Sequence, residues 1–88
     1  MYIPDYDFCS NLQGELFKPE VKGVRREYLQ SKYDLIYSNL LTVLDQYNLP
    51  RPRLTATLCY LHSWTEARAR EAGLIDRTFD GATLIYLP

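Results

Sequence analysis

The sequence has few of the residues on which catalysis and metal binding depend. Its 88 residues include two cysteines, one histidine and four scattered glycines. Nucleophilic catalysis needs a base beside a nucleophile, zinc sites need clustered cysteines and histidines, and phosphate-binding loops need clustered glycines. The sequence shows none of these patterns. We therefore expect a protein that is not an enzyme and that holds no metal and no cofactor.

The two cysteines, Cys9 and Cys59, lie far apart in the sequence and belong to no C-x-x-C motif. This usage favours a reduced, intracellular protein, although it also allows a single disulfide. Cys59 and His62 would share a helix face only if one continuous helix ran through residues 53–63. Because a buried cysteine is usually an inert, small apolar residue, we do not expect a reactive pair.

The sequence also lacks a targeting segment and a long apolar run. Residues 1–5 contain neither the basic region nor the apolar region of a signal peptide. No apolar run approaches the roughly 20 residues that span a bilayer. These absences predict a cytoplasmic protein with no membrane partner.

An excess of charge of one sign is missing as well. The net charge is -1, which is not typical of a protein whose whole surface binds nucleic acid. The charges are nevertheless unevenly distributed. Residues 1–20 carry four acids and one lysine, whereas residues 51–77 carry five arginines and three acids. Arginines suit phosphate ligands, but they also suit ordinary surface ion pairs.

Residues 1–23 are predicted to form an irregular, acidic and aromatic arm of a single domain. Prolines and glycines interrupt this segment, and its aromatic residues are interleaved with acids. The arm either covers the core with its aromatic rings or docks on a partner protein. In the docking interpretation the binding residues are Tyr2, Asp5, Tyr6, Asp7 and Phe8.

The clearest element is a long amphipathic helix over residues 24–48. Apolar residues recur there at alternating spacings of four and three, which is the periodicity of a helix with one apolar face. We interpret this stripe as the core face of the helix, and the alternative is the seam of a homodimer. The stripe consists of Leu29, Tyr33, Ile36, Leu40, Val43 and Tyr47.

Two short helices are predicted next, over residues 53–61 and 64–72. The first is ambiguous, because its leucines fit a helix while its threonines also favour a strand. The second has a capping-box pattern, in which Ser63 is followed three residues later by Glu66. Gly73 would supply the left-handed exit that commonly ends a helix.

The C-terminal residues 74–87 are predicted to form a β-hairpin. Asp80-Gly81 is a favoured two-residue hairpin turn, and folding the chain about it places most apolar residues on one face. The predicted fold class is therefore α+β, with three helices followed by a hairpin.

This order of elements, with Gly73-Leu74-Ile75 before a hairpin whose tip is Asp80-Gly81, resembles the winged-helix family. The resemblance covers about the last 36 residues, roughly 53–87, and its motif has low specificity. It implies that helix 64–72 enters the major groove of DNA and that the hairpin approaches the DNA backbone or minor groove. The implied DNA-binding residues are Ser63, Thr65, Arg68 and Arg77. The sequence departs from the family pattern at His62 and Glu66, where apolar residues are usual.

Two functions remain open at this point. The first is a binding module that acts through protein–protein interaction, as an adaptor or an inhibitor of a larger protein. The near-neutral charge, the eight tyrosines and the acidic arm favour it. The alternative is a winged-helix-like transcriptional regulator that binds duplex DNA. A fold alone does not decide between them.

Overall fold

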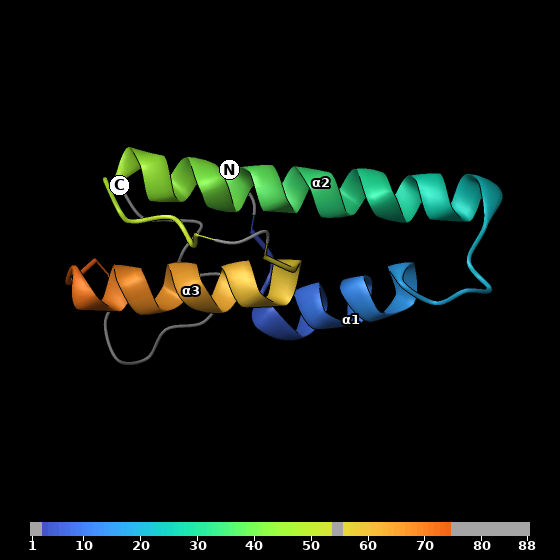
Figure 1. Ribbon diagram of the computed structural model, residues 1–88, viewed down its shortest axis with the longest axis horizontal. Coiled ribbons are helices and arrows are strands. Elements are labelled where there is room, and N and C mark those ends of the chain that lie inside the picture. The colour runs from blue at the N-terminus through green and yellow to red at the C-terminus, as the bar shows by residue number, and fades with distance from the viewer. Residues whose placement is uncertain (1–2, 54–55, 75–88) are drawn as a thin grey trace.

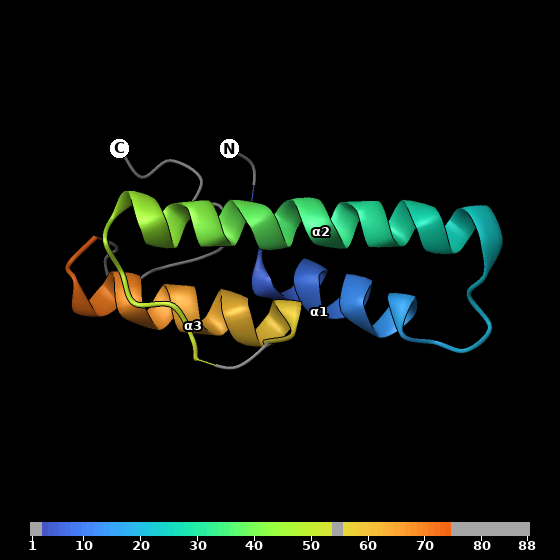
Figure 2. The same cartoon turned by 45° about the horizontal axis from the view of Figure 1, so that its top comes forward.

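The computed structural model describes residues 3–53 and 56–74, which form three helices (Figure 1). Helix α1 spans Tyr6–Leu16, α2 spans Gly23–Gln46 and α3 spans Leu58–Glu71. The long helix α2 forms one layer, and α1 and α3 lie along it in a second layer (Figures 1 and 2). The N-terminal ends of α1 and α3 meet beside the middle of α2, so every pair of helices is in contact.

Helix α1 lies within the segment that was predicted to be irregular. Asp5 caps it, since its carboxylate accepts a hydrogen bond of 2.8 Å from the Phe8 amide. Cys9, Leu12 and Leu16 recur at spacings of three and four and form the buried face. The prediction of an irregular arm is therefore wrong over this range. Pro4 precedes the cap, where it does not interrupt the helix, and the exposed Gly14 is tolerated inside it.

Helix α2 confirms the prediction of a long amphipathic helix. Its stripe faces α1 and α3, and Leu29, Ile36, Leu40 and Val43 are all buried. Tyr33 and Tyr47 are partly buried and pack against the same core. Because the chain covers this stripe itself, the stripe is not free to serve as the seam of a homodimer.

Both α2 and α3 end in the same backbone motif. Asn48 has a φ of 55°, and the Leu49 amide donates to the Leu44 carbonyl at 2.8 Å. Gly73 has a φ of 75°, and the Leu74 amide donates to the Ala69 carbonyl at 2.9 Å. These are Schellman motifs, which satisfy the last carbonyls of a helix. The left-handed exit predicted at Gly73 is confirmed.

Helix α3 replaces the two short helices that were predicted over residues 53–61 and 64–72. Its N-cap is Thr57, and Ser63 lies in the middle of the helix on its exposed side. The buried residues Leu58, Leu61, Thr65 and Ala69 form one stripe that continues past Ser63. The capping-box prediction is wrong because a Ser and a Glu three residues apart fit the middle of a helix as well as its start. Glu66 pairs with Arg70.

The first amides of α3 are held by side chains from other helices as well as by its own cap. The Leu58 amide donates to the Tyr33 hydroxyl at 3.0 Å, and the Cys59 amide donates to the Gln13 side-chain oxygen at 3.2 Å. The Tyr60 amide donates to the Thr57 hydroxyl at 3.4 Å. Each helix start leaves such donors without an intrahelical partner, so α1 and α2 determine where α3 begins.

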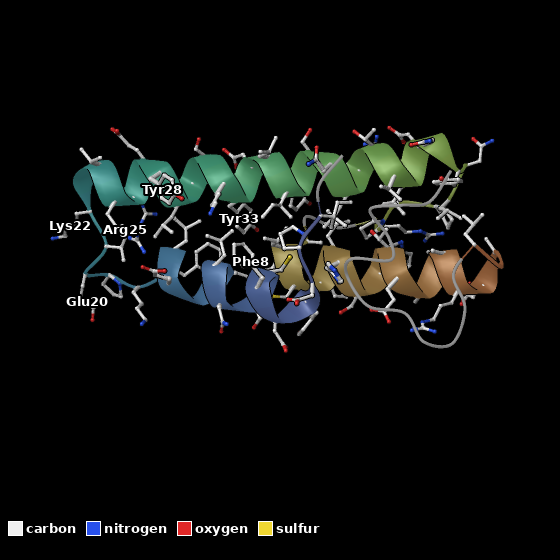
Figure 3. All side chains as sticks on the ribbon, turned by 180° about the vertical axis from the view of Figure 1, so that it is seen from behind. Phe8, Glu20, Lys22, Arg25, Tyr28 and Tyr33 are labelled. Carbon is white, nitrogen blue, oxygen red and sulfur yellow. The ribbon has the colours of Figure 1, made fainter. Side chains whose placement is uncertain are left out.

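Aromatic rings and cations connect α1 to α2 on one side of the molecule. The Lys32 ammonium lies 5.3 Å from the ring centres of both Phe8 and Tyr28. Arg25 pairs with Glu15 and also approaches the Tyr28 ring. Figure 3 shows Tyr28 and Arg25 on α2 above α1. Such cation–π contacts stabilise modestly at exposed sites, so this side supplements the core.

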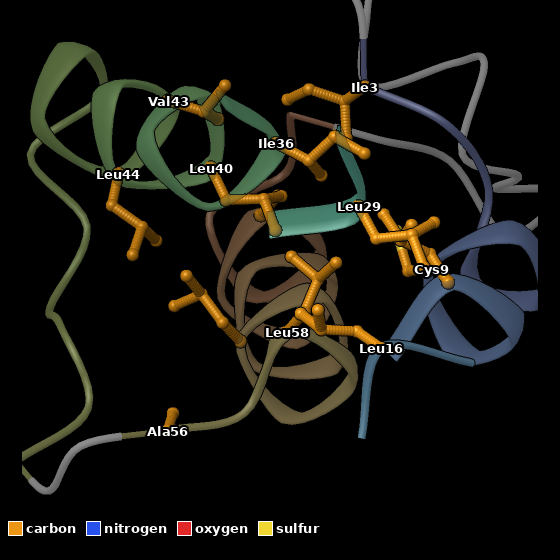
Figure 4. Packing of buried hydrophobic residues seen from close by; sticks show 13 residues of the cluster. Ile3, Cys9, Leu16, Leu29, Ile36, Leu40, Val43, Leu44, Ala56 and Leu58 are labelled. Atoms are coloured by element: carbon orange, nitrogen blue, oxygen red, sulfur yellow. The ribbon is translucent and has the colours of Figure 1, made fainter. Parts of the chain in front are cut away.

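The core lies between the two layers (Figure 4). Ile3, Cys9, Leu16, Leu40 and Leu58 bring together all three helices and the residues before α1, and each is fully buried. The described residues contain no strand, so the predicted α+β class is wrong and this part of the chain is all-helical. The predicted hairpin lies, from residue 75 onward, outside the described residues.

Candidate functional site: an arginine and aromatic groove

A groove lies between α3 and the connector that joins it to α2. Its volume is about 830 Å³, which is within the range of ligand-binding pockets. Its described lining consists of two prolines, three arginines, two aromatic residues and two small residues. They are Pro50, Arg51, Pro52, Arg53, Ala56, Thr57, Tyr60, Trp64 and Arg68.

The α3 wall of the groove is a row of three large side chains. Tyr60, Trp64 and Arg68 are four residues apart, so they lie above one another on one face of the helix. The Tyr60 and Trp64 rings stack at 6.2 Å between centres and 29° between planes. The Arg68 guanidinium lies 4.6 Å from the Trp64 ring centre. We call this row the Tyr60–Trp64–Arg68 ladder.

The connector forms the opposite wall and also fixes the position of the ladder. The Trp64 indole N–H donates to the Pro50 carbonyl at 2.8 Å. Pro50 and Pro52 each fix one backbone angle, and the Schellman motif at Asn48 sets the direction in which the chain leaves α2. The indole is therefore held in place before any ligand arrives.

The groove is positively charged. Three arginines and no acid line it among the described residues. Arg51 pairs with Asp45 and Arg68 pairs with Glu71 at 2.8 Å, but neither carboxylate belongs to the lining. The hydrogen bond to Asp45 raises the pKa of Arg51 above its ordinary value. Among the described residues, the acids that pair with Arg51 and Arg68 therefore lie outside the groove lining, and the lining itself contains only positive charges.

Two of the arginines retain capacity to donate hydrogen bonds. Arg53 is exposed and has no carboxylate partner within the described part of the chain. Arg68 keeps an Nε–H with no hydrogen-bond partner there, but this atom is buried, so a ligand reaches it only if the side chain moves. Guanidinium donors are arranged to bind carboxylate or phosphate in a two-pronged geometry. The groove can therefore hold an anion without first losing all of its internal contacts.

The structure describes three of the four predicted DNA-binding residues, and these three differ in their exposure and position. Thr65 is fully buried, and its hydroxyl donates to the Leu61 carbonyl at 2.8 Å. It cannot contact DNA, so its assignment is wrong. Ser63 is exposed on α3, whereas Arg68 lies in the groove. Arg77 lies outside the described residues.

The predicted protein-binding residues lie around the start of α1. Asp5 is committed to capping the helix, and Asp7 is exposed in the first turn. Tyr6 is 44% exposed and meets His62 edge-on at 6.0 Å between ring centres. Phe8 is 40% exposed beside Lys32. Tyr2 lies outside the described residues, and none of the others lines the groove.

The titratable residues of the core are held in their neutral forms. Burial raises the pKa of the Cys9 thiol to about 12 and lowers the pKa of His62. Cys59 and His62 do share the continuous helix α3, but both cysteines are free thiols and Cys9 is buried. Thiolate is the reactive form of cysteine, so Cys9 is poorly suited to act as a nucleophile. Residues 3–53 and 56–74 bring together no metal-binding group of His, Cys, Asp and Glu.

The sequence analysis did not single out Tyr60 or Trp64 as binding residues. The spacing of Tyr60, Trp64 and Arg68 was the available signal, but it becomes visible only when α3 is continuous. The sequence counted Arg51 and Arg53 among the five arginines of residues 51–77, but it could not place them beside α3, because that position depends on the connector folding back.

Within the described segments, no helix combines the length and apolar character needed to cross a bilayer. A search of protein-family models, of curated proteins and of solved structures finds no match to this chain.

Proposed function

We propose that the protein is a non-enzymatic binding module that captures an acidic segment of a partner protein in its arginine and aromatic groove. One observation carries this proposal: three arginines surround the stacked Tyr60 and Trp64 rings, and no acid is among the described lining residues. A carboxylate-bearing segment complements both the charge and the flat apolar surfaces of this groove.

The residue types in the groove are those that dominate protein interfaces. Tryptophan, tyrosine and arginine are enriched among the residues that contribute most to binding. Rigid aromatic side chains lose little conformational entropy on binding, and the bond from Trp64 to the Pro50 carbonyl reduces that loss further. The arginines would supply orientation and a faster encounter with an acidic partner.

Trp64 provides a direct assay because it is the only tryptophan in the chain. A capped hexapeptide of alternating glutamate and alanine should change its fluorescence on titration. The corresponding peptide of glutamine and alanine should have no effect at the same concentrations. Binding should weaken as salt is added, because exposed charges are screened. Equal binding of both peptides, or no binding of either, would contradict the proposal.

Substitution of Arg53 tests the groove as the location. Arg53→Gln removes one positive charge from the lining without breaking an ion pair of the described residues. We expect it to weaken peptide binding about two- to fivefold, the range expected for one exposed charge contact. The matched control is Lys22→Gln, which removes the same charge beside the first turn of α2, at the opposite end from the connector (Figure 3). Equal losses in both variants would indicate general charge attraction instead of a site.

Duplex DNA is the second anionic ligand that the groove arginines favour. A duplex of about 30 base pairs, added at low salt, would be attracted by the same charges. We expect it to compete weakly with the acidic peptide and to lose this effect near physiological salt. Stronger binding of the duplex than of the peptide at physiological salt would reverse the order of the two functions.

A further inference from the structure

Two of the three groove arginines already hold carboxylates of the chain itself. The Arg51 Nε–H donates to Asp45 at 3.1 Å, and Arg68 contacts Glu71 at 2.8 Å. The Asp45 and Glu71 side chains are 59% and 61% exposed. Exposed ion pairs of this kind contribute little to stability, so a ligand can displace them readily.

The positions of the two acids also make them easy to displace. Asp45 lies in the last turn of α2, and Glu71 is the last residue of α3. Negative charge is unfavourable at the C-terminal end of a helix, where the helix dipole is negative. The two carboxylates therefore gain most of their stabilisation from the arginines and do not stabilise their own helices.

The ladder sets the length of ligand that fits. From Tyr60 to Arg68 the helix rises about 12 Å. An extended peptide advances about 3.3 Å per residue, and its side chains alternate between two faces. About four residues would therefore lie along the ladder, with alternate side chains directed toward the same wall.

We propose that the groove binds an extended acidic segment of about four residues whose carboxylates replace those of Asp45 and Glu71 on Arg51 and Arg68. Arg53, which has no such partner among the described residues, offers the first contact. This inference rests on the proposed function and adds a mechanism to it. The two internal acids occupy the arginines when the partner is absent and compete with the partner when it arrives.

The competition predicts that removing an internal acid tightens binding. Asp45→Asn and Glu71→Gln should each increase affinity for the alternating glutamate peptide about two- to fivefold, since each frees one groove arginine. The control is Glu27→Gln, an exposed position of α2 about 27 Å along the helix from Asp45. It changes the net charge equally without freeing a groove arginine, so its effect on binding should be smaller.

The experiment combines these variants with peptides of increasing length. Trp64 fluorescence gives the affinity of capped peptides of two, four, six and eight residues, and circular dichroism verifies that each variant keeps its helices. Affinity should rise up to about four residues and then level off, as the ladder length requires.

The outcomes separate this inference from the function on which it rests. If wild-type protein binds the acidic peptide but Asp45→Asn and Glu71→Gln match Glu27→Gln, the internal competition does not exist and the binding function stands. A continued rise in affinity beyond six residues would refute the proposed length. If no acidic peptide binds the wild-type protein, both the function and the inference fail.

Discussion

At the scale of single residues, the core depends on a few side chains that all three helices share. Leu40 is fully buried in the middle of the α2 stripe, whereas Leu35 on the same helix is 61% exposed. Protein interiors are closely packed, so a deleted side chain leaves a cavity that neighbouring atoms fill only in part. The two leucines therefore form a matched pair.

Leu40→Ala should lower the free energy of unfolding by about 2–5 kcal/mol, the usual range for a buried leucine. Leu35→Ala should change it by less than about 0.5 kcal/mol. Urea unfolding followed by circular dichroism measures both values. Similar losses at the two positions would mean that Leu35 is covered in solution.

His62 should make stability depend on pH. It is fully buried, and burial lowers its pKa from the ordinary value of 6.5, although Glu66, the Pro4 carbonyl and Asp5 oppose the shift. The Tyr6 ring packs against it as well. Below the unfolded-state pKa the unfolded chain binds the proton more readily than the folded chain.

Stability should therefore be constant above about pH 7 and should fall as the pH decreases through 6.5 toward the lower pKa of the folded state. Thermal unfolding at pH 7.5, 6.5 and 5.5 tests this direction. His62→Gln removes the titrating group, so that variant should show a flatter profile even if its stability is lower throughout. An unchanged slope in the variant would assign the pH dependence to other groups.

At the scale of the helices, stability measurements can test whether α3 starts at Thr57, as the structure shows, or breaks at Ser63, as the sequence predicted. Thr57 is the N-cap of α3, and Ser63 is an exposed residue within the helix. Loss of an N-cap destabilises a helix, whereas alanine in an exposed helical position is favourable. The two hydroxyl residues should therefore respond oppositely to alanine.

Thr57→Ala should reduce the free energy of unfolding by about 1 kcal/mol. Ser63→Ala should leave it unchanged or raise it by about 0.5 kcal/mol. Urea unfolding of both variants measures these two changes in the free energy of unfolding. A larger loss at Ser63 would restore the predicted break between two short helices.

The sequence predicted α2 because its apolar residues recur at a regular spacing over a long, uninterrupted range. It did not predict α1 because proline and glycine, which usually interrupt helices, are frequent around that helix. Pro4, Gly14 and Pro19 suggested an irregular arm, yet only Gly14 lies inside α1. The burial of Cys9 and Leu16 against the other helices outweighs the local preference. Local patterns identify helices, but packing decides where weak ones begin and end.

At the scale of the whole molecule, the two layers produce an elongated shape of 42 × 25 × 18 Å over the described residues. The sequence predicted the apolar face of α2 but could not show what covers it. The groove was equally hidden, because its two walls, the connector and α3, come together only through tertiary contacts such as the bond from Trp64 to Pro50.

The covered stripe predicts that the chain is a monomer. Leu29, Ile36, Leu40 and Val43 are buried within one chain and cannot also form a dimer seam. Sedimentation velocity at micromolar concentrations should give a single species with the mass of one chain. A dimer that persists on dilution would require a different interface.

The way in which α3 begins also implies an order of folding. Its first two amides rely on acceptors from α1 and α2, the Gln13 side-chain oxygen and the Tyr33 hydroxyl. A helix nucleus is costly to form without such support. We therefore expect the α1–α2 pair to assemble first and α3 to grow from the surface that the pair provides. Because the ladder lies on α3, the binding groove would then be the last part of the molecule to form and the first to be lost on unfolding.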